Sequence, residues 1–183
     1  MSDIKDRMFG TRDIVIIAAL AAVSGVVYTG IGQVWLAASA AFGPLGGSLI
    51  GLFQFGHVLA YALLRKPGVI FATSVLSTVV QTLIGDPTGI LVIGWGVTHG
   101  IAAEAVVLLV RYRSTSFWTL ASSAGVGAVA GQFFSYWLYG WEHAIWMFFV
   151  SLPIVLIASA IESGGLAYLV ARRVEKSGVL RGR

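Results

Sequence analysis

The chain contains no cysteine, and that absence removes several kinds of chemistry at once. Without thiols it has no disulfide framework, no thiolate metal site and no cysteine nucleophile. It also has neither a G-x-x-x-x-G-K-S/T phosphate-binding loop nor an H-E-x-x-H zinc motif, which argues against a P-loop ATPase and a metalloprotease. The stretch Ser163-Gly164-Gly165 lacks the G-x-S-x-G context of a serine hydrolase. We therefore expect a protein without enzymatic activity, cofactor or bound metal.

Charge is also scarce, because charged residues make up only 11% of the chain while hydrophobic residues make up 57%. This balance lies outside the range of soluble globular domains. The apolar runs are long and continuous, without the period-two alternation of membrane strands, and about 20 such residues cross a bilayer core as a helix. The predicted fold is all-α, a compact six-helix membrane bundle forming one domain over residues 1–183. Its spans are expected at about 13–30, 44–64, 68–84, 89–110, 117–139 and 145–171.

Positive charge is absent from every second connection between these spans. No Lys or Arg occurs in 31–42, 85–88 or 141–144. Short cationic loops stay in the cytoplasm during insertion, so the pattern predicts a multi-pass plasma-membrane protein with both termini cytoplasmic. The same pattern explains the net charge of +4 without a nucleic-acid partner. The cations are Lys5, Arg7, Arg12, Arg65, Lys66, Arg111, Arg113, Arg172, Arg173, Lys176, Arg181 and Arg183.

Small residues recur four apart along several predicted spans, a spacing that lets helix backbones approach closely in lipid. In the fourth and fifth spans we interpret this spacing as internal packing of the bundle. On the first span, Ala18 and Ala22 serve either internal packing or the docking of another membrane protein, and the residues alone leave both open. The glycine pairs are Gly47 and Gly51, Gly96 and Gly100, and Gly127 and Gly131.

Aromatic and polar residues concentrate toward the predicted outer side, where five of the six tryptophans lie. An interfacial belt accounts for some of them, and an aromatic pocket open to the outside is the alternative. Trp95 and His99 lie four apart and therefore share a helix face. Because no Lys or Arg lies at this depth, such a pocket suits a flat, neutral or cationic, nitrogen-rich solute. The candidate ligand-binding residues on this side are Gln81, Trp95, His99, Gln132, Tyr136, Trp141 and Glu142.

Glu104 lies deeper in the fourth span, where a polar side chain is costly and marks function by default. It is turned away from His99 and lies about seven residues, or roughly 10 Å of helix, from Arg111. It either pairs with a polar group of a neighbouring helix or contacts the ligand, so it joins the candidate ligand-binding residues. His57, on the second span, is interpreted as a histidine of the bundle core.

Three segments resemble one family of membrane proteins. They are Arg65-Lys66-Pro67-Gly68 after the second span, Gly85-Asp86-Pro87-Thr88-Gly89 before the fourth, and Gly100-Ile101-Ala102-Ala103-Glu104-Ala105 within it. Together with the six-span layout, they make the chain similar to the S components of energy-coupling factor (ECF) vitamin transporters, and most similar to the YkoE family. The motifs are spread over about the middle third of the chain, and the layout covers all of it.

The resemblance implies a substrate-binding S component that captures thiamine or its hydroxymethylpyrimidine precursor outside the cell. It further implies assembly with an ECF T transmembrane subunit and two ATPase subunits, which would drive uptake. In such families the alanine-rich stretch of the first helix meets the T subunit, a role that falls here on Ala18 and Ala22. Glu104 becomes a candidate partner for an aminopyrimidine ring. The alternative is an autonomous small-solute transporter or channel.

Overall fold

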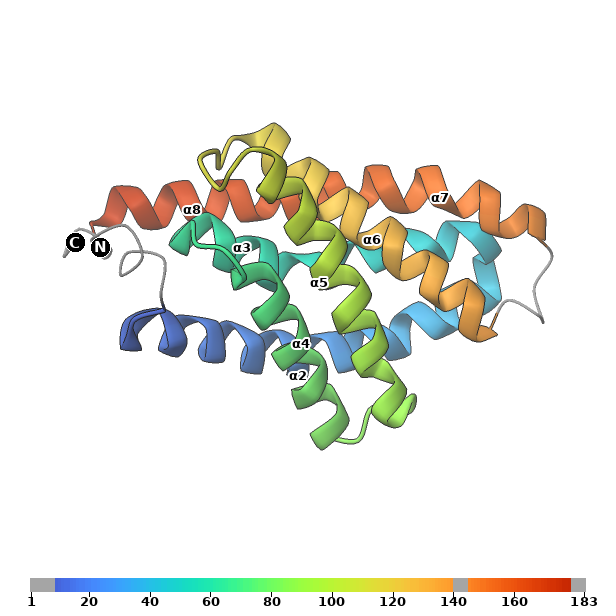
Figure 1. The fold of residues 1–183 in the computed structure, drawn as a ribbon. Coiled ribbons are helices and arrows are strands. Elements are labelled where there is room, and N and C mark those ends of the chain that lie inside the picture. The colour runs from blue at the N-terminus through green and yellow to red at the C-terminus, as the bar shows by residue number, and fades with distance from the viewer. Residues whose placement is uncertain (1–8, 140–144, 179–183) are drawn as a thin grey trace.

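The computed structural model describes residues 9–139 and 145–178, and every regular element in these two ranges is helical (Figure 1). The predicted all-α class is confirmed for this part of the chain. The segments η1 and η2 are 3-10 helices, and η4 is a π-helix. In chain order the elements are α2 (Thr11–Phe42), η1 (Gly43–Gln54), α3 (Phe55–Leu64), α4 (Val69–Leu83), η2 (Gly89–Leu91), α5 (Val92–Leu109), α6 (Phe117–Tyr139), α7 (Ile145–Ser159), η4 (Ala160–Gly165) and α8 (Leu166–Ser177).

Within the described part of the chain, three continuous helical stretches are long and apolar enough to cross a membrane, namely Thr11–Leu64, Gly89–Leu109 and Ile145–Ser177, and α4 is a shorter apolar helix. Helix α4, the pair η2 and α5, and helix α6 coincide closely with the predicted ranges 68–84, 89–110 and 117–139. The last range, predicted as 145–171, continues without a break through α7, η4 and α8. Long apolar runs thus mark these elements well.

Helix α2 extends well past residue 30, so the connection expected over 31–42 between the first two spans is part of a continuous helix. These residues contain no proline and are rich in alanine, so nothing in them stops a helix. The stop comes at Gly43, whose φ of 56° costs glycine little. At about 1.5 Å per residue, α2 measures roughly 48 Å, longer than a hydrocarbon core of roughly 30 Å. The helix must therefore tilt or extend beyond that core.

The second predicted span, 44–64, is divided between the 3-10 segment η1 and the α-helix α3. The η1 sequence, GPLGGSLIGLFQ, is rich in glycine, which weakens α-helical preference. A Cβ added to Gly46 would lie 2.5 Å from Ser39 N of α2, and one at Gly51 would lie 2.9 Å from Ser159 N of α7. These glycines therefore let η1 lie directly against both α2 and α7.

Helix α3 lies in the core of the bundle, since eight of its ten residues are buried. Val58 and Tyr61 have no exposed surface at all. The outward faces of α2 and α7 carry exposed apolar side chains instead, such as Val23 (64% exposed) and Phe149 (60%). An exterior of this kind is compatible with lipid and costly in water. The burial pattern thus agrees with a membrane protein whose polar groups lie inside.

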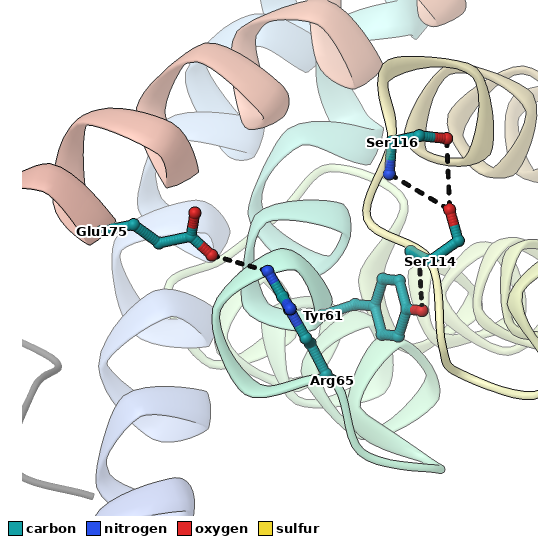
Figure 2. Close-up of polar contacts among 5 residues, drawn as sticks. All are labelled: Tyr61, Arg65, Ser114, Ser116 and Glu175. Atoms are coloured by element: carbon teal, nitrogen blue, oxygen red, sulfur yellow. Dashed lines mark hydrogen bonds and ion pairs between the residues drawn. The ribbon is translucent and has the colours of Figure 1, made fainter.

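Charged side chains hold one end of the bundle together. Lys66 Nζ lies 2.6 Å from Asp13 Oδ2 at the start of α2, and Arg65 Nη2 lies 2.6 Å from Glu175 Oε1 of α8. Figure 2 shows the second pair, together with the Tyr61 hydroxyl, which donates a 2.8 Å hydrogen bond to a carbonyl of the α5–α6 connection. In Figure 1 the blue start of α2 and the red end of α8 lie on the same side. We refer to this side as the basic end.

Candidate functional site

A cavity of about 570 Å³ lies among α2, η1, α4, α5, α6 and α7. Its lining includes Asp86 in the α4–α5 turn and Tyr139 at the end of α6, so it lies toward the end of the bundle opposite the basic end. Among the described lining residues Asp86 is the only charged one. The volume matches that of small-molecule sites, and the charge suits a neutral or cationic solute rather than an anion.

Five of the predicted ligand-binding residues line this cavity, although they come from three different helices. Helix α5 contributes two of them, α6 two, and the last turn of α4 one. The other two residues predicted on the outer side, Trp141 and Glu142, lie outside the described residues. The five lining residues are Gln81, Trp95, His99, Gln132 and Tyr136.

An aromatic wall forms where α5 meets α6. The ring of Trp95 packs edge-on against Phe134, with their centroids 4.9 Å apart, and its centroid lies 5.9 Å from that of Tyr139. Its indole Nε1 donates a 2.7 Å hydrogen bond to Ser135 Oγ, which in turn donates to Gly131 O at 3.0 Å. The ring contacts and the hydrogen bond of Nε1 hold the Trp95 indole in one orientation within the protein. Trp95 is therefore a preorganised stacking surface for a flat solute.

Polar atoms that a ligand could satisfy gather around the same space. Four lining residues carry a buried side-chain nitrogen or oxygen with no hydrogen-bond partner among the described residues. Leaving such an atom unpaired costs about 1–3 kcal/mol, so these positions favour a ligand that brings hydrogen-bond donors and acceptors. The atoms are Trp35 Nε1, His57 Nδ1, His99 Nε2 and Gln132 Oε1.

Two histidines form the inner part of the cavity, near the core of the bundle. His57 Nε2 lies 2.7 Å from Gln54 Oε1, and the centroids of His57 and His99 lie 6.5 Å apart. Since an amide oxygen only accepts, His57 carries its proton on Nε2 and offers Nδ1 as an acceptor. Gln54 has no exposed surface, and its hydrogen bond to Nε2 fixes the orientation of the His57 ring.

Sequence reasoning assigned no ligand role to His57 or Trp35. His57 lines the cavity as well as lying in the core, because it faces the cavity from buried helix α3. Trp35 belongs to the connection expected over 31–42, and in the structure it lies on the part of α2 beyond residue 30. The four-residue spacing of Trp35 and Ser39, both cavity residues, was the available signal that this segment is helical.

Glu104 does not line the cavity. Its carboxylate accepts hydrogen bonds from Gly68 N at 2.7 Å and Phe71 N at 3.1 Å, at the start of α4. Helix α4 has no side-chain cap of its own, so Glu104 supplies acceptors for amides that would otherwise be unpaired. Nearby, burial raises the pKa of Tyr112 to about 12, and the Glu104 charge adds to the rise. Of the two interpretations of Glu104, contact with a neighbouring helix is the one seen.

The described residues contain no group of three or more histidines and carboxylates placed to hold a metal ion. The polar lining is made instead of indoles, imidazoles, amides and hydroxyls. Together, the apolar helical exterior and this cavity define an integral membrane protein that binds a small solute.

Comparison with known proteins agrees. The chain belongs to the family described as ABC-type cobalt transport system, permease component, whose model matches residues 12–130. It is 29% identical over 178 residues to the proposed HMP/thiamine permease protein YkoE of Bacillus subtilis (strain 168), covering 96% of this chain and 89% of that protein. A solved structure described as the crystal structure of an S-component of ECF transporter superposes with a TM-score of 0.87, at 29% identity, over 96% of this chain and 90% of that one.

These similarities confirm the resemblance stated from the sequence. The chain is an S component of an ECF transporter, which is a multi-pass plasma-membrane protein that binds substrate and not an enzyme. An S component acts on a vitamin-type substrate and works with the subunits of an ECF module.

Proposed function

We propose that this chain captures thiamine or its hydroxymethylpyrimidine precursor (HMP) from outside the cell. The observation that carries the proposal is the cavity, which combines a preorganised aromatic wall and unpaired polar atoms, with no Lys or Arg among its described lining residues. The name of the Bacillus subtilis relative points to the same two compounds.

The chemistry of the two compounds fits that lining. An aminopyrimidine is flat, so it stacks on an indole, and its edge carries both an amine donor and ring-nitrogen acceptors. The unpaired Gln132 Oε1 accepts from such an amine, while Trp35 Nε1 donates to a ring nitrogen. Thiamine adds a cationic thiazolium ring, which aromatic faces and the nearby Asp86 carboxylate favour. A cobalt ion is a poorer match, because the described residues offer no cluster of metal ligands.

The proposed binding set consists of the five predicted residues that line the cavity, with Trp35 and His57 added. Trp141 and Glu142 remain predictions. Glu104 is not part of the proposed binding set, because both its carboxylate oxygens accept hydrogen bonds from backbone amides at the start of helix α4.

The proposed topology has six crossings with both termini in the cytoplasm. Two observations support it: the described Lys and Arg residues belong to elements that meet at the basic end, and the cavity lies toward the opposite end. Cationic ends stay in the cytoplasm, so the cavity would face outward to meet an incoming solute.

Coupling to ATP hydrolysis is proposed to occur through a T transmembrane subunit and two ATPase subunits. Ala18 and Ala22 are exposed on α2, where small side chains leave room for a partner helix to approach. The loaded bundle would then reorient when the ATPases drive the T subunit. An autonomous transporter or channel is the alternative, and uptake of thiamine into liposomes that contain this chain alone would favour it.

The direct test is titration of the purified protein with thiamine and with HMP, using Co²⁺ as a third titrant. We expect 1:1 binding of at least one organic compound, with quenching of tryptophan fluorescence and an increase in Tm, and no response to Co²⁺. Absence of both quenching and thermal shift with thiamine and HMP would remove the assignment. A saturable response to Co²⁺ alone would replace it with a metal substrate.

A further inference from the structure

The imidazole of His99 occupies the position that a side chain at Gly131 would fill. A Cβ built on Gly131 would lie 1.6 Å from His99 Nε2 and 2.2 Å from its Cδ2, far closer than atoms approach without bonding. Gly131 lies on α6, and His99, which is only 6% exposed, lies on α5 and lines the cavity. The α6 surface thus has a notch at Gly131, and the notch holds an aromatic ring.

Helix α6 cannot easily move away from that ring. Ser135, one turn beyond Gly131, donates to the Gly131 carbonyl and accepts the indole N–H of Trp95, which lies on the same helix as His99. The bond from Trp95 to Ser135 connects α5 to α6 one turn from the notch, and the bond from Ser135 to the Gly131 carbonyl, within α6, orients the serine hydroxyl. Any widening of the α5–α6 spacing would break the bond from Trp95.

Helix α5 is equally constrained on its other side. A Cβ at Gly96 would lie 2.3 Å from Thr78 Oγ1, and one at Gly100 would lie 3.1 Å from Phe71 Cα, both on α4. The α5 backbone is therefore already in close contact with α4 just before and just after His99. A methyl group added at Gly131 has to be accommodated by rotation of the imidazole, and the empty space that the imidazole borders is the cavity.

We propose that Gly131 is a positioning residue that keeps the His99 ring in the α6 wall and so determines how deep the cavity extends. The depth of the cavity limits the length of the ligand that fits. The affinity for a long ligand with two rings therefore depends on this depth more than the affinity for a ligand with one ring. This proposal rests on the proposed function, because it assumes that thiamine, with two rings, and HMP, with one, enter this cavity.

The test is Gly131→Ala, measured by the ratio of the two affinities. We expect thiamine binding to weaken about tenfold, the usual scale of overpacking, and HMP binding to change by less than about threefold. Gly125→Ala is the matched control on the same helix, since its Cβ would meet Leu156 of α7 at 2.8 Å, and Leu156 does not line the cavity. Equal losses for both ligands in Gly131→Ala, or the same change of ratio in Gly125→Ala, would overturn the proposal.

A readout without ligand separates this proposal from the proposed function. The chain has three histidines, so in ¹⁵N-histidine-labelled protein the His99 ring signals are assigned by their loss in His99→Ala. We expect Gly131→Ala to shift these signals strongly and Gly125→Ala to leave them in place; unchanged signals in Gly131→Ala refute the positioning role. If the wild-type protein binds neither compound, the proposed function fails while this measurement still decides the role of Gly131.

A double variant covers the case in which Gly131→Ala does not fold. Removal of the ring in His99→Ala/Gly131→Ala eliminates the close contact, so folding is expected to return to the level of His99→Ala alone. A double variant that remains unfolded would show that the glycine serves contacts other than the His99 ring, and would refute the proposal.

Discussion

The carboxylate of Glu104 accepts a 2.7 Å hydrogen bond from the backbone nitrogen of Gly68, a residue 36 positions earlier in the chain. A second oxygen of the same carboxylate accepts from Phe71 N at 3.1 Å. An acidic residue within a predicted membrane span therefore pairs with backbone amides at the start of helix α4. This is a structural role, and it has a measurable consequence.

We predict that Glu104→Gln lowers the free energy of unfolding by about 1–2 kcal/mol and leaves ligand affinity unchanged. The amide has one accepting oxygen where the carboxylate has two, so one amide at the start of α4 loses its partner. Unfolding in detergent and ligand titration measure the two quantities. Glu175→Gln is the control: it breaks an exposed ion pair and is expected to cost less. A large loss of affinity in Glu104→Gln would restore a ligand role.

Gln132→Leu is expected to weaken ligand binding up to about tenfold without lowering stability. Gln132 Nε2 donates to Ser151 Oγ at 2.9 Å, which directs the unpaired Oε1 as an acceptor for the ligand. Leucine has similar volume and removes an unsatisfied buried oxygen. Calorimetric titration and thermal unfolding provide the comparison. Unaltered affinity would mean that Gln132 does not contact the ligand.

Ala18→Trp and Ala22→Trp are each predicted to abolish co-purification with a T subunit while ligand binding persists. Both residues are exposed on α2, and a large ring there blocks the close approach of another helix. Ile157→Trp, on an exposed position of α7, serves as the lipid-facing control. Assembly at the normal level in both alanine variants would exclude this stretch of α2 as the docking surface.

The absence of cysteine makes the topology testable with single-cysteine variants. Thr88→Cys, in the α4–α5 turn, is expected to react with a membrane-impermeant maleimide in intact cells. Ser177→Cys, at the end of α8, is expected to react only after the membrane is permeabilised. Ser114→Cys, in the α5–α6 connection, should behave like Ser177→Cys. The reverse labelling pattern would invert the topology and place the cavity toward the cytoplasm.

Local signals predicted most of the helices correctly. Helices α4, α5 and α6 follow apolar runs bounded by glycine, proline or polar turns, and these act within a few residues of where they stand. Residues 31–42, expected as a connection between the first two spans, continue helix α2 because the alanines among them favour a helix and no proline interrupts it.

Part of the candidate site was likewise predicted from local sequence, and part was not. Five of the lining residues, Gln81, Trp95, His99, Gln132 and Tyr136, were predicted from the sequence because their polarity or aromatic character is unusual for a membrane span, and that is a property of each position alone. Polarity alone did not separate Glu104 from His57, since both are polar residues within predicted membrane spans. Only the packing of helices distant in sequence assigned one to the start of α4 and the other to the inner part of the cavity.

The sequence by itself determined that the chain is an all-α membrane protein, because long apolar runs and one-sided cations are read directly along the chain. The tertiary structure alone decided what each polar residue and each glycine does. Gly131 illustrates the reason, since its place in a small-residue pattern predicted helix packing, while the atom that actually fills its notch belongs to His99, on another helix.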